Sequence, residues 1–354
     1  MDKHYNIIIL GASYGSLLGI KMAMAGHRVD LVCLPDEVKA INENGAIVRL
    51  PIREKNTVIE LNSKNCKGTL AAIGTDDIRL DQYDLVALAM QEPQYSADVI
   101  SKLLMEIGER KLPCMSIMNM PPLAYIARIK DLDTSMLIDA YTKADVWQYF
   151  DPANITLCSP DPQAFRPPDE PINVLQVGLP TNFKVARFDS EDHTKILRDL
   201  QKDIEEITYD FDGENIGLPV KLKVHDSIFV PLAKWSMLLA GNYRCVQEEQ
   251  AVAIKEAVHN DILKSEQIYN WVSQIAIELG AVASDQVPFE KYAAAAESLI
   301  RPSSAARALF AGAKNIERVD KLIKLIANQM GKDSSIIDDI IDEVDRRVSI
   351  NRDA

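Results

Sequence analysis

An apolar run that ends in a turn of small residues is the first feature of this sequence that could do chemistry. Ile7 to Leu10 leads into the turn Gly11, Ala12, Ser13, Tyr14, Gly15 and Ser16, and a helix-like stretch follows. Unpaired backbone N–H groups at the start of a helix attract a pyrophosphate. The turn is therefore predicted to bind a dinucleotide, although serine stands at positions 13 and 16 where the ideal GxGxxG pattern has glycine. The alternative is a strand end that binds no nucleotide.

The end of the second strand normally decides between NAD and NADP. An acid there binds the ribose hydroxyls, whereas a basic residue accepts the 2′-phosphate. The stretch Cys33 to Glu37 contains Asp36, and no Lys or Arg occurs before Lys39. Asp36 is predicted to bind the cofactor ribose or, equally, to cap the next helix, so the cofactor is NAD or NADP.

Together with this turn, the segment Gly26 to Val32 and the dipeptide Asn44-Gly45 resemble the ketopantoate reductase family. The family patterns GAGAIG, GHxVxLxxR and a helix ending in NG align without gaps through Gly45. The family's NADP-binding arginine falls on Leu34. The resemblance implies a Rossmann domain followed by a helical domain, and hydride transfer between a nicotinamide cofactor and a small 2-oxo or 2-hydroxy acid.

The resemblance also assigns roles to two residues that follow the predicted strands 85–90 and 114–117. Gln91 stands where the family has a lysine near the cofactor, and Asn119 retains the asparagine of a QNG segment. Asn119 is thereby expected beside the nicotinamide and the substrate carbonyl, with roles in catalysis and cofactor binding. The alternative for Asn119 is a turn former at a strand end.

The family's helix signature WxKLxxNxxxN is out of register in this chain. Alignment on Trp235 puts Met237 at the lysine that protonates the ketone and Gly241 at the first asparagine. Lys234 lies about one helical turn before Met237, and Asn242 is adjacent to Gly241. We therefore predict Lys234 as the catalytic acid and Asn242 as a substrate-binding residue. A lysine that snorkels beside a tryptophan is the alternative.

Two residues near the C-terminal end complete the predicted site. Ser304 and Glu317 match the family's substrate-recognising serine and glutamate once a one-residue shift is allowed. Glu317 is predicted to act in catalysis and in substrate binding, and Ser304 in substrate binding. A serine at this place is equally a helix cap.

Composition limits the partners. The 354 residues are 47% hydrophobic and 26% charged, an ordinary globular mixture for two domains. The net charge of -13 argues against nucleic acid and against an anionic membrane surface. No apolar run is long enough to span a bilayer, which predicts a cytoplasmic protein. The five cysteines form no CxxC pair, so buried thiols and no metal site are expected.

Short apolar runs and amphipathic stretches alternate over the first 120 residues, as strands and crossover helices do in a parallel sheet. We predict strands at 6–10, 29–33, 46–50, 57–61, 85–90 and 114–117, and helices at 14–25, 36–43 and 96–107. A strand pair at 173–177 and 184–188 and a helix at 194–207 are expected to finish this domain. Prolines punctuate 131–171, for which we predict loops, one strand at 155–158 and no assigned function.

From about residue 223 the spacing is helical almost everywhere, with no convincing strand. Helices are predicted at 226–245, 260–279, 303–330 and 334–348. The fold class is therefore α/β: a doubly wound Rossmann domain over 1–222 and an all-helical domain over 223–354 for substrate binding and dimerisation. A homodimer is expected.

Three functions are compatible with the sequence. The first is an NAD(P)-dependent oxidoreductase acting on a small 2-oxo acid, in which the protein orients the cofactor and polarises the oxygen. Because the lysine signature is altered, an opine-type dehydrogenase that performs reductive amination is a second. The third is a non-catalytic dinucleotide-binding protein that has lost the proton donor.

Overall fold

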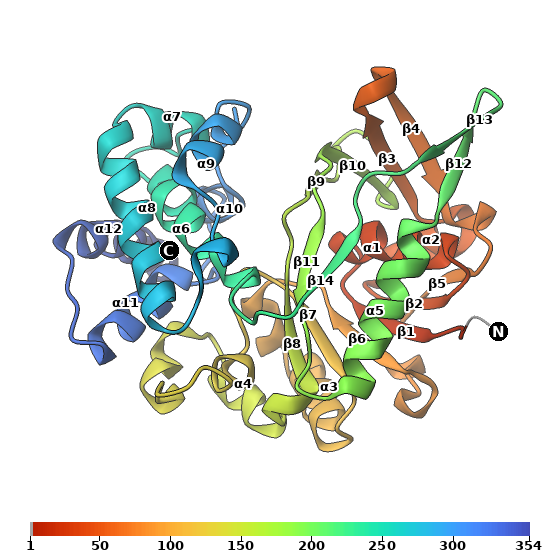
Figure 1. The fold of residues 1–354 in the computed structure, drawn as a ribbon, viewed down its shortest axis with the longest axis horizontal. Helices are drawn as coiled ribbons and strands as arrows, with labels where there is room; N and C mark the ends of the chain where they lie inside the picture. The colour runs from red at the N-terminus through yellow and green to blue at the C-terminus, as the bar shows by residue number, and fades with distance from the viewer. Residues whose placement is uncertain (1–2) are drawn as a thin grey trace. The chain divides into compact units, whose positions relative to one another are not determined.

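The computed structural model describes residues 3–354, which separate into two compact units (Figure 1). The first unit contains residues up to 90, 97–118 and 146–226, and the second contains 91–96, 119–145 and 227–354. Two short segments from the N-terminal half thus group with the C-terminal helices. Among the described residues no helix is long and apolar enough to cross a membrane.

An eight-stranded sheet forms the centre of the first unit. Its order is β14-β11-β8-β7-β6-β1-β2-β5, and all neighbours are parallel except β8 and β11. The six strands from β5 to β8 have the doubly wound order of a Rossmann domain. The strands are β1 (Asn6–Leu10), β2 (Arg28–Val32), β5 (Thr69–Ile73), β6 (Leu85–Leu88), β7 (Cys114–Ile117), β8 (Ile155–Ser159), β11 (Phe183–Ala186) and β14 (Leu222–His225).

A smaller sheet, a hairpin and four helices complete this unit. The sheet has the order β4-β3-β10-β9, and the hairpin joins β12 to β13. The strands are β3 (Ile47–Ile52), β4 (Thr57–Asn62), β9 (Gln163–Phe165), β10 (Val174–Leu179), β12 (Thr208–Phe211) and β13 (Glu214–Gly217). The helices are α1 (Tyr14–Met24), α2 (Pro35–Asn44), α3 (Asp98–Glu109) and α5 (Glu191–Glu205).

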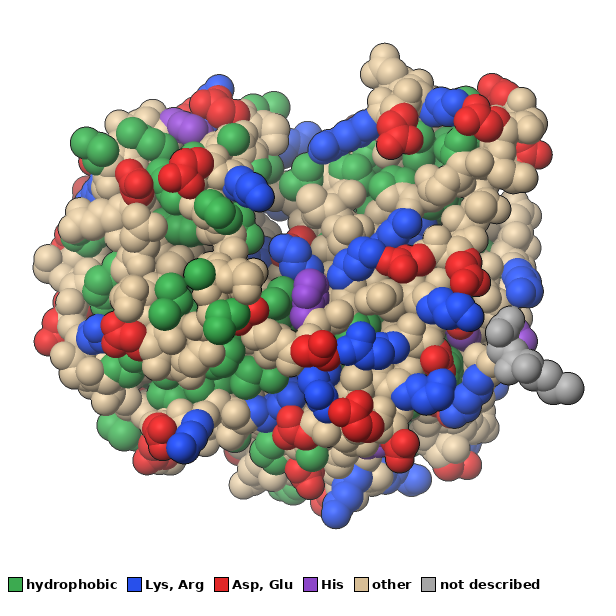
Figure 2. Space-filling model, viewed as in Figure 1, with side chains coloured by type: hydrophobic (Ala, Val, Ile, Leu, Met, Phe, Trp, Pro, Cys, Tyr) green, Lys and Arg blue, Asp and Glu red, His purple; other side chains and the backbone are tan. Residues whose placement is uncertain are grey.

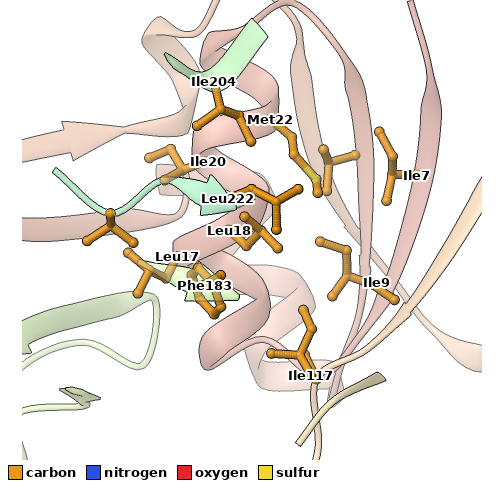
Figure 3. Packing of buried hydrophobic residues seen from close by; sticks show 14 of the residues in the cluster. Ile7, Ile9, Leu17, Leu18, Ile20, Met22, Ile117, Phe183, Ile204 and Leu222 are labelled. Carbon is orange, nitrogen blue, oxygen red and sulfur yellow. The ribbon is translucent and has the colours of Figure 1, made fainter. Parts of the chain in front are cut away.

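Helix α1 runs through the core of the first unit rather than along its surface (Figure 3). Every residue from Gly15 to Ala23 is buried, and the helix contacts β2, β3, β5 and α5. Leu17, Leu18 and Ile20 pack in one hydrophobic cluster with residues of β1 such as Ile9. Such burial provides about 1.5 to 3 kcal/mol for each large apolar side chain. The turn before α1 is therefore attached to a helix that is buried from Gly15 to Ala23.

The second unit is helical. Its helices are α4 (Leu123–Ile126), α6 (Lys234–Met237), α7 (Ile254–His259), α8 (Ile262–Glu278), α9 (Phe289–Ala296), α10 (Ser304–Phe310), α11 (Val319–Gln329) and α12 (Ser335–Asp353). Residues 226–245 do not form the single helix predicted. A 3-10 turn (Pro231–Ala233), α6, a π-turn (Leu238–Asn242) and a second 3-10 turn (Tyr243–Cys245) follow one another instead.

Two other predictions about this part of the chain are wrong. The helix expected at 303–330 is interrupted between α10 and α11, because Gly312 adopts a φ of +91° just after α10. A strand also exists beyond residue 223, since β14 pairs in parallel with β11. Its sequence, Leu222 to His225, alternates apolar and polar residues, but only over four positions, which is too short a run to mark a strand.

The predicted pairing of 173–177 with 184–188 is wrong as well. Strand β10 pairs with β3 and β9 in the smaller sheet, whereas β11 pairs with β8 and β14. The pairing with β3 buries Leu175 and Val177 together with Val48 and Leu50 in the core cluster. Apolar burial thus outweighs closeness along the chain in selecting the partner.

The proline-rich segment 131–171 divides between the units. Residues up to 145 belong to the second unit and contain a 3-10 turn, Thr134–Ala140, which contacts α4 and α11. Residues from 146 belong to the first unit, where the predicted strand exists as β8 and a further strand, β9, follows it. The segment therefore forms ordered structure, and each of its two parts packs within its own unit.

Charged side chains of both signs alternate on the visible surface of the first unit (Figure 2). Helix α5 shows the pattern, because Lys195 pairs with Asp199 at 2.6 Å and Arg198 pairs with Asp226. Exposed pairs of this kind contribute about 0 to 1 kcal/mol each. Their main effect is to leave no large area of one sign on this face of the unit.

Burial of Lys21 within α1 predicts a pH-dependent stability. Its Nζ donates to the Pro219 carbonyl at 3.2 Å, and desolvation lowers its pKa from 10.5 to about 7, with Lys221 adding to the effect. Between these values the unfolded chain binds one more proton, so the free energy of unfolding rises with pH. We expect Lys21→Met to remove a rise of about 1 kcal/mol per pH unit from about pH 7 to 8.5, below the cysteine range. Urea unfolding of both proteins at each pH measures it, and equal slopes would contradict it.

Candidate functional site

The glycine turn after β1 has the close packing that its residues predict. Gly11 adopts a φ of +105°, and a Cβ there would lie 2.7 Å from Met90 Cγ and 2.8 Å from the Ala89 carbonyl oxygen. A Cβ on Gly15 would lie 2.9 Å from Ile9 Cγ2. Only glycine fits at position 11, so the turn passes tightly over the end of β6 and α1 starts close to β1.

The start of α1 has no side-chain cap from its N-cap residue. Ser13 occupies the N-cap, but its side chain makes no capping hydrogen bond. The Ser16 hydroxyl donates to the Ala12 carbonyl and is buried, so it closes the turn itself. The Tyr14 hydroxyl donates to the Pro162 carbonyl at 2.9 Å. The first-turn backbone N–H groups thus have no side-chain cap, which fits a phosphate as their partner.

Acidic residues surround the end of β2. Leu34, at the place of the family's arginine, is 68% exposed, and Asp36 is exposed in the first turn of α2. The buried Glu37 carboxylate accepts from the Leu34 N–H at 2.9 Å and forms an ion pair with Arg166. Among the described residues, the cation paired with Glu37 is Arg166 from the proline-rich segment, and this carboxylate neutralises it.

A buried carboxyl lies in the second unit, where Asn119 and Glu317 meet. Asn119 Nδ2 donates to Glu317 Oε2 at 3.4 Å, and the backbone N–H of Glu92 donates to Glu317 Oε1 at 3.3 Å. The Met120 N–H also bonds this carboxyl. Asn119 Oδ1 is buried and has no hydrogen-bond partner among the described residues. The cluster brings together two predicted catalytic residues and leaves one acceptor for a donor of a ligand.

Burial sets the protonation of Glu317. Desolvation raises the pKa of Glu317 from 4.5 to about 7, the negative charge of Glu92 raises it further, and the hydrogen bonds from Glu92, Asn119 and Met120 lower it. The side chain is 8% exposed. A carboxyl with this pKa gives up and takes back a proton at neutral pH, which is the property of a general acid and base.

The interruption between α10 and α11 fixes the main chain of Glu317. The buried Tyr243 hydroxyl donates to the Glu317 carbonyl at 2.6 Å and accepts from the Val319 N–H at 2.9 Å. Arg318 pairs with the fully buried Asp320 at 2.8 Å. The Tyr243 hydroxyl therefore accepts from the first N–H of α11 and also fixes the backbone of Glu317.

The π-turn changes the register of the helix signature. A π-turn accommodates one more residue than an α-turn, so Asn242 reaches the side of the helix that a straight helix would give to Gly241. A Cβ on Gly241 would lie 2.0 Å from the Tyr292 hydroxyl, which excludes any larger residue. Lys234 starts α6 and Met237 ends it, both half-buried. The catalytic role of Lys234 stays a prediction.

The serine in contact with this helix is Ser303 rather than Ser304. Ser303 is 2% exposed, its hydroxyl donates to the Asn242 carbonyl at 2.7 Å, and it accepts from the Ala306 N–H at 3.1 Å as the N-cap of α10. Ser304 is exposed. The cap interpretation therefore holds for the neighbouring serine, and substrate binding by Ser304 stays a prediction.

Gln91 and Glu92 differ sharply although they are adjacent. Gln91 is exposed and its backbone N–H donates to the Gln94 side chain at 2.9 Å. Glu92 is 2% exposed and contacts Glu317. Sequence reasoning selected Gln91 and missed Glu92, Ser303 and Arg166. A glutamate followed by proline after a buried strand looks like an ordinary turn, so no signal separated Glu92 from other surface acids.

No family model matches the chain, and no curated protein matches its sequence. Solved structures do match over nearly the whole chain. A putative ketopantoate reductase from Ralstonia solanacearum MolK2 is 14% identical with a TM-score of 0.67, over 99% of both chains. D-mandelate dehydrogenase with NADH and anilino(oxo)acetate is 16% identical with a TM-score of 0.65, over 98% of this chain and 99% of that one.

A dimeric ketopantoate reductase from Staphylococcus aureus is also similar, with 10% identity and a TM-score of 0.61, over 98% of this chain and 99% of that one. Identities this low establish the fold and nothing finer. The chain has the fold of the ketopantoate reductases, a Rossmann sheet followed by helices, which confirms the resemblance and the fold class at that level.

The two serines before α10 make a test of the capping geometry. Ser303→Ala removes the cap and the bond to the Asn242 carbonyl, and we expect it to lower the free energy of unfolding by about 1 to 2 kcal/mol. Ser304→Ala at the exposed neighbour is the matched control, with a change within about 0.5 kcal/mol. Chemical denaturation compares them, and equal effects of the two substitutions would refute the assignment.

Proposed function

We propose that this chain is an NAD(P)-dependent oxidoreductase that transfers a hydride to or from C2 of a small 2-oxo or 2-hydroxy acid. The observation that carries the proposal is the buried Glu317 carboxyl, with a pKa of about 7, in contact with Asn119. The fold supports it, because it is shared with a dehydrogenase solved with NADH and with ketopantoate reductases. The uncapped turn before α1 fits a dinucleotide.

A bound reduced nicotinamide supplies the hydride. The residues of the chain bind the cofactor, orient the substrate and supply the proton. The backbone N–H groups of Ser13 and Gly15, at the start of α1, would hold the pyrophosphate. Asn119 Oδ1, which has no partner of its own, accepts a hydrogen bond from the carboxamide or the substrate hydroxyl. Glu317 gives its proton to the carbonyl oxygen as the C–H bond forms at C2, and a solvent proton restores the acid. In oxidation Glu317 takes the hydroxyl proton.

Lys234 is the second assignment for the proton donor, and Asn242 and Ser304 remain proposed substrate-binding residues. Glu317 ranks first because it is buried, contacts Asn119, and has a pKa matched to neutral pH. The sequence also predicts a cytoplasmic homodimer, and this prediction is part of the proposal.

NADH is the proposed cofactor rather than NADPH. Two carboxylates, Asp36 and Glu37, lie at the end of β2 against one guanidinium, Arg166, and Leu34 supplies no charge. The net negative charge disfavours a 2′-phosphate, whereas a carboxylate accepts hydrogen bonds from ribose hydroxyls. Coulomb repulsion at this place therefore selects the cofactor without a phosphate.

Kinetics with and without Glu317 test the reaction. In an NADH assay with a panel of 2-oxo acids, with and without amines, we expect Glu317→Gln to lower kcat by about 100- to 10,000-fold. Reduction needs the protonated acid, so kcat falls as pH rises through about 7, whereas kcat for oxidation falls as pH drops through the same value. Glu290→Gln, at an exposed glutamate of α9, is the control.

A different pattern of activities would reject these roles. If Lys234→Ala abolishes turnover and Glu317→Gln does not, lysine is the acid and the assignment to Glu317 fails. Turnover that requires an amine indicates the opine-type reaction. Tight binding of NADH without turnover of any acid supports the non-catalytic alternative.

Fluorescence titration with NADH and NADPH tests the cofactor choice. We expect NADH to bind at least about tenfold more tightly, which is a difference of about 1.4 kcal/mol. Leu34→Arg adds a cation at the end of β2 and is expected to strengthen NADPH binding, whereas the neutral Leu34→Gln leaves the ratio unchanged. A native preference for NADPH would contradict the charge argument.

A further inference from the structure

The proline-rich segment reaches the candidate site through one hydrogen-bonded carboxylate. Glu92 Oε1 accepts from the Thr142 N–H at 2.9 Å and the Lys143 N–H at 3.4 Å, and Oε2 accepts from the Thr142 hydroxyl at 2.9 Å. Backbone N–H groups only donate, so these bonds favour the ionised carboxylate. Burial raises the pKa of Glu92 and the three donors oppose that effect.

The segment that supplies these donors is firmly held. The buried Tyr141 hydroxyl donates to the Pro121 carbonyl at 2.6 Å. The Asp133 N–H donates to the Gln329 side chain at 3.0 Å, and Gln329 Nε2 donates back to the Asp133 carbonyl at 3.0 Å. Leu137 is fully buried. Thr142 therefore stands at a fixed place relative to Glu92.

Glu92 and Glu317 are two buried acids in one cluster, and their hydrogen bonds decide which one carries the proton. The two shorter bonds of Glu92 are 2.9 Å, whereas those that Glu317 receives from Glu92 and Asn119 are 3.3 and 3.4 Å. Shorter bonds from fixed donors stabilise charge better.

The other charged groups around Glu317 are already engaged. The Arg318 guanidinium pairs with Asp320 and Asp345, and the pKa of Tyr243 is raised well above its ordinary value by burial, so that its hydroxyl stays neutral. Among the described residues, Glu92, Asn119 and Met120 donate hydrogen bonds to the Glu317 carboxyl, and the negative charge of Glu92 also raises its pKa. Glu92 therefore adjoins the Glu317 carboxyl through its backbone N–H, and its negative charge acts on that carboxyl.

We propose that Glu92 is a positioning residue whose ionised carboxylate, held by Thr142 and Lys143, keeps the proton on Glu317. The segment 131–145, which has no other assigned role, thereby tunes the acid of the site. The inference rests on the proposed function for its catalytic meaning, but the protonation of Glu317 is a property of the protein alone. Burial is the main cause of the raised pKa of Glu317, and like-charge repulsion from the ionised Glu92 adds to it.

Infrared titration of the full chain, without cofactor or substrate, tests the proposal. The carboxylic-acid C=O band that is lost in Glu317→Gln reports the protonated acid, and its midpoint is expected at about pH 7. Glu92→Gln removes the charge at constant shape, and we expect the midpoint to fall by about one pH unit or more. A midpoint that is unchanged or higher overturns the proposal.

Thr142→Val gives a second, milder variant. Thr142 is exposed, so loss of its hydroxyl leaves the core intact while removing one donor from Glu92. We expect a smaller fall in the same midpoint and the same displacement of the pH profile of kcat. Thr134→Val, on the same segment, is the matched control and should change neither. A shift equal to that of the control would contradict the role of Thr142.

The catalytic role of Glu317 and the electrostatic role of Glu92 can be contradicted independently. If the midpoint moves as expected and no 2-oxo acid is turned over, the proposed function fails and the electrostatic role of Glu92 stands. If turnover depends on Glu317 and Glu92→Gln leaves both the midpoint and the pH profile unchanged, the role of Glu92 fails alone.

Discussion

The burial of two neighbouring acidic residues, Glu92 and Glu317, is the constraint on which the candidate site depends. Glu92 and Glu317 are 2% and 8% exposed, the Glu92 N–H donates to the Glu317 carboxyl at 3.3 Å, and the negative charge of Glu92 adds to the effect of burial in raising the pKa of Glu317. The two carboxyl groups are not stabilised equally, because the hydrogen bond from Thr142 to Glu92 is shorter than the bond from Asn119 to Glu317. One acid is thereby left to hold the proton.

This constraint accounts for the irregular parts of the helical unit. Continuation of α10 through residues 311–318 would engage the Glu317 carbonyl within the helix, whereas the interruption leaves it to Tyr243. Tyr243 in turn follows the π-turn, which also places Asn242. Irregular helical turns are frequently found at functional sites, because they aim side chains that a regular helix would not. Here the π-turn and the break between helices act on the same group of residues.

The sequence was most informative where burial is continuous and local. Strands β1 and β7 have the predicted bounds, because an apolar run flanked by turn residues carries its own signal. Asn119 and Glu317 were selected from the family resemblance, and the structure brings them into contact. Glu92 and Thr142 were missed because their meaning arises from a contact between segments 50 residues apart. The broken helices were missed because Tyr243 caps α11 from a distant part of the chain.

A carboxyl and an ammonium are not equivalent proton donors. A lysine becomes neutral when it gives up its proton, whereas Glu317 becomes an anion beside Glu92, from which it is repelled. The proton affinity of Glu317 is therefore raised, which opposes donation of the proton to the substrate and favours its return. A pKa of about 7 balances these demands at neutral pH, because neither the transfer to a carbonyl oxygen nor its reversal is then costly. The loss of the family's lysine at Met237 is thus compatible with reversible hydride transfer, provided that the second carboxylate holds this balance.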